Sequence, residues 1–282
     1  MEILKLGILP SFCHVNIYEG ENVMNAFMKV QNLHKIYGDK VVLNKINFDL
    51  KEGEFLSVLG PSGCGKTTLL KLLIGIESQT SGKILLKGND ISQLNSSKRN
   101  MGIVFQNYAL FPNMTVLQNI EYALKFHETY KKDARKIALE VLEQVGLTEH
   151  MNKRVDRLSG GQQQRIAIAR TLALKPDVIL FDEPLSALDA ANRLTMRQEI
   201  KRIQKEYHST IIYITHDQEE AFTMSDRIMV MSEGHVEQLD TPLNIYNHPK
   251  NDFVNDFVVK HLQTKLNDLE KCMVKDYDYE YK

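Results

Sequence analysis

The sequence predicts an α/β fold in which helices cover a mostly parallel β-sheet and one region is purely helical. Three observations support this prediction. Apolar strand-like segments alternate with helical segments along most of the chain, which is typical of a parallel sheet covered on both faces. The segment "DVILFDEP" (Asp177–Pro184) is almost continuously apolar, as expected for a strand buried on both faces. The stretch from about Asn107 to Asp156 lacks strand-like segments and has helical periodicity.

The first part of the chain predicts strands around a glycine-rich loop. From Met28 to Leu50, two strand-like segments flank a turn at "YGDK". An apolar strand over Glu54–Gly60 then enters the loop, which a helix over Thr67–Ile74 follows. Two further strand-like segments cover Gly82–Ile91 and Met101–Gln106.

The second part continues the alternation after the helical insertion. The stretches "TVLQNIEYALKFH" and "KKDARKIALEVLEQVG" have helical periodicity, and a third helix ends before Pro176. A helix over Ala190–Tyr207 leads to strand-like segments over Ser209–Thr215 and Asp226–Ser232, with a short helix between them.

Composition excludes several classes of protein. The chain has 282 residues and a formal net charge of −1, so no general affinity for nucleic acid is indicated. Its three cysteines are widely spaced and form neither a metal pattern nor a disulfide framework. No apolar run approaches the length of a membrane span.

The glycine-rich loop predicts a phosphate site. The segment "GPSGCGKTT" matches G-x-x-x-x-G-K-[ST] between a strand and a helix, a context in which backbone N–H groups wrap phosphate oxygens. Lys66 would reach the β- and γ-phosphates, and the Thr67 hydroxyl would bind Mg²⁺. The loop residues expected to contact nucleotide are Gly60, Pro61, Ser62, Gly63, Cys64, Gly65, Lys66, Thr67 and Thr68.

Two carboxylates end the apolar strand Val178–Glu183. Charge at the end of a buried strand is costly unless it meets a metal or a reactant. We expect Asp182 to support Mg²⁺ and Glu183 to polarise a water for attack on the γ-phosphate.

A second anion site is indicated at the start of the helix in "RLSGGQQQRIAIAR" (Arg157–Arg170). Ser159 is a good N-cap, whereas Gly160 and Gly161 lower helix propensity and leave the backbone N–H groups uncovered. A bare helix N-terminus attracts anions.

Three further residues carry little information by themselves. His216 directly follows a strand, and Gln106 ends another; both are ordinary polar residues for such positions. Tyr37 lies in a turn and could stack on a base, but an exposed turn tyrosine is common.

Together these segments resemble the ATP-binding subunits of ABC transporters, from about Met28 to Val259. The segment "LSGGQ" (Leu158–Gln162) matches the signature of that family and is far more specific than the phosphate loop. Gln106 matches the Q-loop, "SALD" (Ser186–Asp189) the D-loop and His216 the H-loop, all in family order, and Tyr37 matches the adenine-stacking aromatic.

This resemblance implies a P-loop NTPase core of RecA type, an antiparallel β subdomain and a helical subdomain over about 107–158. The ATPase domain would span 28–262, after a poorly ordered extension over 1–27 and before a polar tail over 263–282 that we expect to lack regular structure. The implied catalytic residues are Glu183, His216, Lys66 and Gln106. The implied ATP contacts are the phosphate loop with Tyr37, Ser159, Gly160, Gly161, Gln162 and Asp189, and the implied Mg²⁺ ligands are Thr67, Gln106 and Asp182.

The resemblance also explains the second anion site. In this family two ATPase domains pack head to tail, so that each signature helix closes over the ATP held by the other subunit. Ser159, Gly160 and Gly161 would therefore face the γ-phosphate of a second subunit, which we expect to be another copy of this chain.

The segments "THDQEEA" and "TPLNIYNHPKNDFVNDFV" resemble the importer branch, which serves polyamines, ferric iron, phosphonates and sugars. The implied partners are membrane-spanning permease subunits and, indirectly, an extracytoplasmic solute-binding protein, with this subunit peripheral on the cytoplasmic face of the membrane. Tyr108 and Phe111 are candidates for the permease-facing surface, or for plain packing. The alternatives are an export or lipoprotein-release ATPase and a non-transport ABC ATPase; a P-loop kinase is disfavoured by "LSGGQ".

Overall fold

A computed structural model of the chain describes residues 26–274. The expected extension over residues 1–27 lies outside the described residues except for its last two, and so does the end of the expected polar tail, from residue 275 onward. Among residues 26–274, no helix combines the length and the apolar character needed to cross a membrane.

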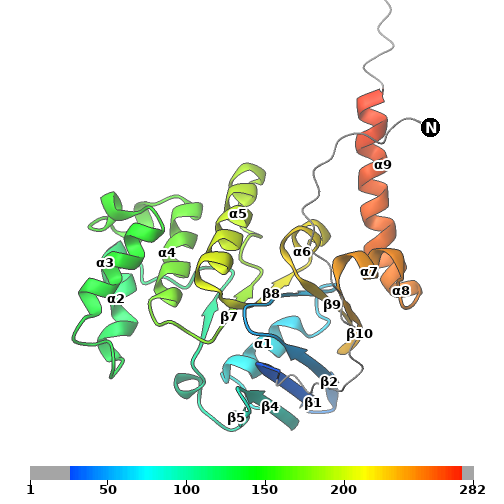
Figure 1. The fold of residues 1–282 in the computed structure, drawn as a ribbon, viewed down its shortest axis with the longest axis horizontal. Helices are drawn as coiled ribbons and strands as arrows, with labels where there is room; N and C mark the ends of the chain where they lie inside the picture. The colour runs from blue at the N-terminus through cyan, green and yellow to red at the C-terminus, as the bar shows by residue number, and fades with distance from the viewer. Residues whose placement is uncertain (1–25, 275–282) are drawn as a thin grey trace, which may run out of the picture.

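The strands form two sheets, seen in the lower part of Figure 1. The smaller sheet is antiparallel with the order β2-β1-β4-β5. In it, Met28 at the start of β1 pairs with Leu50 of β2 and with Leu86 of β4. The bounds are β1 Met28–Tyr37, β2 Lys40–Leu50, β4 Ser81–Leu86 and β5 Asn89–Asp90. The single strand expected over Gly82–Ile91 is therefore two strands, since Lys87 and Gly88 form a turn with positive φ.

The larger sheet has the order β10-β9-β3-β8-β7-β6, and only its β10–β9 pair is antiparallel. Its strands β3, β7 and β8 consist almost entirely of buried residues, as continuous apolar runs predict. The bounds are β3 Phe55–Leu59, β6 Met101–Val104, β7 Val178–Asp182, β8 Thr210–Thr215, β9 Arg227–Ser232 and β10 His235–Asp240. The predicted α/β fold with a mostly parallel sheet is confirmed.

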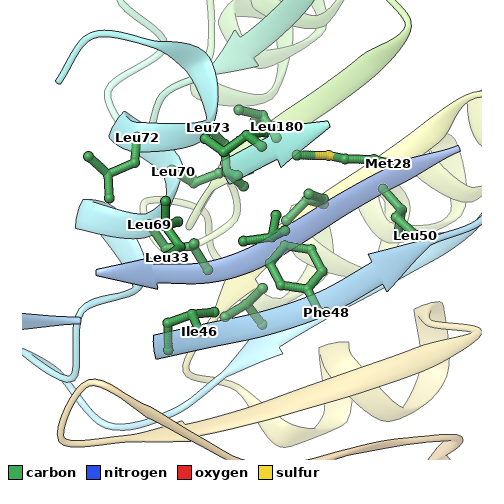
Figure 2. Close-up of a cluster of buried hydrophobic side chains, with 14 of the residues drawn as sticks. Met28, Leu33, Ile46, Phe48, Leu50, Leu69, Leu70, Leu72, Leu73 and Leu180 are labelled. Atoms are coloured by element: carbon green, nitrogen blue, oxygen red, sulfur yellow. The ribbon is translucent and has the colours of Figure 1, made fainter. Parts of the chain in front are cut away.

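Helix α1 (Lys66–Ile74) packs between the two sheets. Figure 2 shows its leucines, among them Leu69 and Leu73, against Leu33 and Phe48 of the antiparallel sheet, with Leu180 of β7 beside them. Because α1 begins directly after the glycine-rich loop, this core fixes the direction from which the loop enters the helix.

Helices α2 (Val116–Phe126), α3 (Ala134–Gln144) and α4 (Gly160–Leu172) pack together beside the larger sheet, on the left of Figure 1. Both α2 and α4 begin with a capping box, made by Thr115 with Gln118 and by Ser159 with Gln162. The predicted N-cap at Ser159 is confirmed.

The helices that follow β7 begin with one that packs on the larger sheet in the same apolar cluster as α4. They are α5 Ala190–Tyr207, α6 Gln218–Met224, α7 Pro242–Asn247, α8 Asp252–Val254, a π-helical segment Asn255–Lys260 and α9 His261–Val274. The expectation that the chain loses regular structure after Leu262 is wrong through Val274, because α9 is helical there. Leu262 packs at the edge of an apolar cluster, and Lys265 pairs with Glu219 of α6 at 3.0 Å. In Figure 1, α9 extends away from both sheets.

Candidate functional site

The candidate site lies where neighbouring parallel strands end. Strands β3, β8, β7 and β6 are adjacent and parallel, so their carboxyl ends meet at one edge of the sheet. The glycine-rich loop follows β3, Glu183 follows β7, His216 follows β8 and Gln106 comes shortly after β6. Residues that are distant in the sequence are thus brought together by the strand order.

The loop is held by its glycines and by Lys66. The Lys66 side chain is buried, and its Nζ donates to the carbonyl oxygens of Gly60 at 2.7 Å and Pro61 at 2.9 Å. Gly65 has φ 106°, and a Cβ there would lie 2.7 Å from Leu43 Cδ2. A Cβ at Gly60 would lie 2.4 Å from the carbonyl oxygen of Met231. Both glycines are therefore required by the path of the backbone.

Cys64 is a buried part of this loop. Burial raises the pKa of its thiol, and the opposing effect of nearby Lys66 is smaller. Its sulfur lies 4.0 Å from Lys66 Nζ. The thiol is therefore a packing group at neutral pH.

Asp182 and Thr67 face one another across the strand ends. Thr67 Oγ1 donates to Asp182 Oδ1 at 3.4 Å, and a hollow of about 450 Å³ is lined by Asp182 together with Gln106 and its neighbours Phe105, Asn107 and Ala187. Burial, and next the charge of Glu183, raise the pKa of Asp182. A hydroxyl, an amide and a carboxylate are a donor set suited to Mg²⁺.

Glu183 and His216 are in direct contact. His216 Nδ1 lies 3.0 Å from Glu183 Oε2, and both side chains reach solvent. Glu183 has a φ of 45°, an uncommon value for a non-glycine residue, and its N–H donates to the carbonyl oxygen of Ile214 in β8. The backbone thus turns sharply after β7 and aims the carboxylate at the end of β8.

Tyr37 ends β1 at the edge of the antiparallel sheet. Its ring is 43% exposed, with Lys35 Nζ 4.6 Å from the ring centroid. A hydrogen bond to the carboxylate of Glu77 raises the pKa of Tyr37. Because Tyr37 is partly exposed, its ring can stack on a planar group once Lys35 moves or on the face away from it.

The start of α4 is exposed and lies beside the segment that precedes α5. Ser159 and Gln162 hydrogen-bond to one another, and Gln162 also to His150. A Cβ at Gly160 would meet Leu188 at 3.4 Å, and one at Gly161 would meet Asn192 at 3.8 Å. Asp189 caps α5 by accepting from the Asn192 N–H. The structure therefore brings the second anion site to the D-loop segment of its own chain.

Of the two alternatives for Tyr108 and Phe111, packing holds for Tyr108 and exposure for Phe111. Tyr108 is only 7% exposed and packs in the core around Phe181, so it does not line a surface. Phe111 is exposed and contacts Tyr122 with the two rings tilted, and Tyr122 in turn contacts Phe126 edge to face. These three aromatic side chains form an exposed patch over the start and end of α2.

Sequence reasoning missed the charged residues behind His216. Arg193 and Arg197 of α5 face Asp217 and Glu220 of α6. The available signal was a pair of arginines four residues apart, which share one helix face, followed by carboxylates directly after His216.

Residues 43–186 match a family model described as "ABC transporter", which covers about half of the chain. The chain belongs to the ABC transporter ATP-binding family. The chain is similar to the spermidine/putrescine import ATP-binding protein PotA of Bacillus cereus. The two are 43% identical over 268 residues, which are 90% of this chain and 82% of that protein.

Two other relatives extend well beyond the part that matches this chain. The PotA protein of Bacteroides thetaiotaomicron is 47% identical over 233 residues, which are 83% of this chain and 50% of that protein. The Fe(3+) ions import ATP-binding protein FbpC of Fusobacterium nucleatum is 46% identical, over 84% of this chain and 64% of that protein. The chain thus spans about half to two thirds of the length of these two relatives.

Solved structures resemble the ABC fold described above. A dimeric post-hydrolysis state of the ATP-binding cassette MJ0796, bound to ADP and Pi, matches with a TM-score of 0.67 and 35% identity, over 76% of this chain and 98% of that one. The cbiO1 protein from Clostridium perfringens, part of the ABC transporter complex cbiONQ, matches with a TM-score of 0.73 and 29% identity, over 86% and 99%.

Proposed function

We propose that this chain is the ATP-binding and ATP-hydrolysing subunit of an ABC importer. The observation that carries the proposal is the convergence of the phosphate loop, Asp182, Glu183 and His216 at adjacent strand ends, with Glu183 and His216 3.0 Å apart. The import names of the relatives from Bacillus, Bacteroides and Fusobacterium support the direction of transport.

The loop binds the phosphates of ATP through its backbone N–H groups and Lys66. Lys66 already points across the loop, so on binding it exchanges the carbonyl oxygens of Gly60 and Pro61 for phosphate oxygens. Thr67, Asp182 and Gln106 would hold Mg²⁺. When bound, the ion neutralises charge on the phosphate oxygens. The exposed ring of Tyr37 stacks on the adenine.

Glu183 is the general base in this proposal. A carboxylate beside the γ-phosphate accepts a proton from the attacking water. His216 hydrogen-bonds to this carboxylate and so fixes its orientation. Once nucleotide is bound, the exposed imidazole can also contact the γ-phosphate.

A second copy of the chain completes each site. At the exposed start of α4 the capping box uses the N–H groups of Ser159 and Gln162, so the N–H groups of Gly160 and Gly161 are the ones presented to the γ-phosphate on the second copy, with the Ser159 and Gln162 side chains and Asp189 beside them. The dimeric arrangement of the similar MJ0796 structure supports this assignment. ATP then favours the closed dimer because it contacts both copies only in that state.

The partners of the dimer are membrane-embedded permease subunits, which place this chain on the cytoplasmic face of the membrane, and an extracytoplasmic solute-binding protein acts through them. The exposed patch of Phe111, Tyr122 and Phe126 is the proposed permease contact, since contiguous exposed aromatics mark interaction surfaces. The relatives are named for spermidine/putrescine and for Fe(3+), so their names leave the solute to be identified by transport assays.

The decisive experiment is the substitution Glu183→Gln. The amide keeps the shape of the side chain but cannot take a proton, so kcat should fall at least ~100-fold while the Kd for ATP stays within a few-fold. Light scattering with MgATP should then detect a stable dimer. Glu206→Gln is the control, because Glu206 is exposed on α5 and pairs with Arg202, and it should behave like wild type. Near-normal turnover by Glu183→Gln would remove Glu183 as the base.

A further inference from the structure

A cluster of charged side chains joins α5 to α6 behind the candidate site. Arg193 Nη1 lies 3.9 Å from Asp217 Oδ2, and Arg197 Nη2 lies 3.7 Å from the same oxygen. Arg197 also faces Glu220 at 3.8 Å. Only a sixth of the Arg197 side chain and a third of the Arg193 side chain are exposed, so the cluster is largely shielded from water.

The carboxylates of this cluster are connected to the residues before and after His216. Asp217 follows His216 directly, and its Oδ1 accepts from the N–H groups of Glu219 and Glu220 at the start of α6. The buried Glu220 accepts from the hydroxyl of Thr215, the residue before His216, at 2.8 Å. The backbone on either side of the imidazole is therefore anchored to α6.

Arg193 of this cluster also contacts the D-loop, Ser186–Asp189. Helix α5 begins directly after Asp189, and Arg193 lies one turn into it. Arg193 Nη2 donates to the carbonyl oxygen of Leu188 at 3.1 Å. One guanidinium therefore touches the D-loop backbone with one nitrogen and faces the carboxylate next to His216 with the other.

The guanidinium of Arg193 is only partly exposed to solvent. The Nε atoms of Arg193 and Arg197 are both buried and have no hydrogen-bond partner among the described residues. A buried N–H without a partner costs free energy. The contacts of the Arg193 terminal nitrogens are the hydrogen bond to the Leu188 carbonyl oxygen at 3.1 Å and the ion pair with Asp217 at 3.9 Å.

We propose that Arg193 is a positioning residue for ATP hydrolysis, coupling the D-loop at Leu188 to His216 through Asp217. The inference rests on the proposed function. The guanidinium of arginine can donate a hydrogen bond through one nitrogen while its other nitrogen lies at ion-pair distance from a carboxylate, whereas the ammonium of lysine is a point charge. A shift of the D-loop, which lies beside the start of α4 that faces the second copy in the proposed dimer, would thus move the anchor of the imidazole that contacts Glu183.

The test compares Arg193→Gln and Arg193→Lys with the control Arg202→Gln. Arg202 lies on the same helix and pairs with Glu199 and Glu206 of that helix. For Arg193→Gln we expect kcat to fall by about 10-fold, which corresponds to roughly 1.4 kcal/mol of transition-state free energy. The KM for ATP should stay within twofold and the Tm close to wild type. Arg193→Lys should restore less than half of the lost rate, and Arg202→Gln should equal wild type.

A double substitution tests the route through Asp217. If Arg193 acts through Asp217, the variant Arg193→Gln/Asp217→Asn should be no slower than the slower single variant, whereas independent effects would multiply. Multiplied losses, a raised KM with unchanged kcat, or full rescue by lysine would overturn the proposal. If Arg193→Gln fails to fold, Arg193→Lys decides by the same criteria.

The two proposals fail in distinguishable ways. Wild-type kcat in Arg193→Gln and Arg193→Lys, with Glu183→Gln inactive, overturns the coupling role of Arg193 alone. Wild-type kcat in Glu183→Gln as well overturns the proposed function of the site.

Discussion

The position of Asp182 suits a metal ligand but disfavours the charge of its carboxylate. A carboxylate suits a Mg²⁺ site, but burial and the neighbouring Glu183 raise its pKa and so oppose the ionised form that a metal needs. The hydrogen bond from the Thr67 hydroxyl lowers the pKa of Asp182, but its effect is smaller than that of burial and of Glu183. In the protein without ligand, this carboxylate therefore works against stability at neutral pH, as groups at functional sites often do.

The substitution Asp182→Asn should stabilise the protein without ligand and abolish Mg²⁺-dependent hydrolysis. The folded pKa of Asp182 is raised, so its contribution to stability is fully present below the unfolded pKa and is lost as pH rises through the folded pKa. Asparagine does not ionise, so the Asp182→Asn variant does not lose stability as the pH rises in this way. We therefore expect its Tm advantage, measured by calorimetry, to be larger at pH 7.5, about 2–4 °C for each kcal/mol gained, than at pH 5.

Asp39→Asn is the matched control for this prediction, because Asp39 lies in the exposed turn between β1 and β2. Its change in Tm should be small and equal at both pH values. A Tm advantage of Asp182→Asn that does not depend on pH would show that the charge of Asp182 is not the destabilising feature.

Helix α4 begins with two glycines that its own chain does not use for packing. A Cβ at Gly161 would meet only Asn192, at an ordinary contact distance of 3.8 Å. Steric need therefore does not explain this glycine, which fits the role of leaving the N–H groups uncovered for an anion.

The action of α4 on a second copy can be tested with two inactive variants. Lys66→Ala removes the lysine of the phosphate loop, and Gly161→Asp places a carboxylate where the γ-phosphate of the other copy should dock. Each homodimer should hydrolyse ATP at under a tenth of the wild-type rate, the second because like charges would meet in a desolvated gap. A mixed dimer contains one site with an intact loop and an intact α4, so it should occlude one nucleotide per dimer.

The contrary result is informative because a Cβ at Gly161 meets its own chain only at an ordinary contact distance. If α4 served the ATP of its own chain, the intact loop of the mixed dimer would face its own aspartate. No nucleotide would then be occluded, and the proposed exchange between copies would be wrong.

Much of the secondary structure could be predicted because local patterns decide it. The continuous apolar runs of β3, β7 and β8 and the cap at Ser159 are such patterns. Helix α9 could not be predicted in the same way: Leu262 packs on a cluster formed by distant segments, and Lys265 pairs with Glu219, 46 residues away. Tertiary contacts of this kind override weak local preference.

The proximity of the site residues depends on the strand order, which no single segment contains. The chain order is β3, β6, β7 and β8, whereas the sheet order is β3-β8-β7-β6. The motifs identified Glu183 and His216 as candidates, but their contact follows from the adjacency of β7 and β8 and from the positive φ of Glu183. The link from Arg193 to Asp217 likewise joins α5 to α6 across the intervening strand β8.

The domain that holds the site should not need the end of the chain. Deleting residues 265–282 removes the Lys265–Glu219 pair, and an exposed pair of this kind contributes about 0–1 kcal/mol. Residues 1–23 carry no motif and no sustained periodicity. A chain lacking both segments should bind ATP within twofold of the wild-type Kd, measured by titration calorimetry.

A deeper truncation provides the contrast. Ending the chain after Lys250 removes Val254 and Val258, which are fully buried in the cluster with Ile228 and Ile245. Losing large buried side chains costs several kcal/mol, so this shorter protein should unfold at a clearly lower temperature. A loss of ATP affinity of roughly tenfold or more in the milder truncation would instead show that the ends support the site.

Helix α9 is attached to the segment that carries His216. Gln218 of α6 donates to the carbonyl oxygen of Phe257, just before α9, at 3.1 Å. Lys265 of α9 donates to Glu219 of α6 at 3.0 Å. A helix of 14 residues is about 21 Å long, and α9 points away from both sheets (Figure 1). Both contacts lie near the start of α9, so we expect any rotation of α6 to displace the far end of the helix more than its base. A dye on exposed Lys271 would report that swing without touching the chemistry.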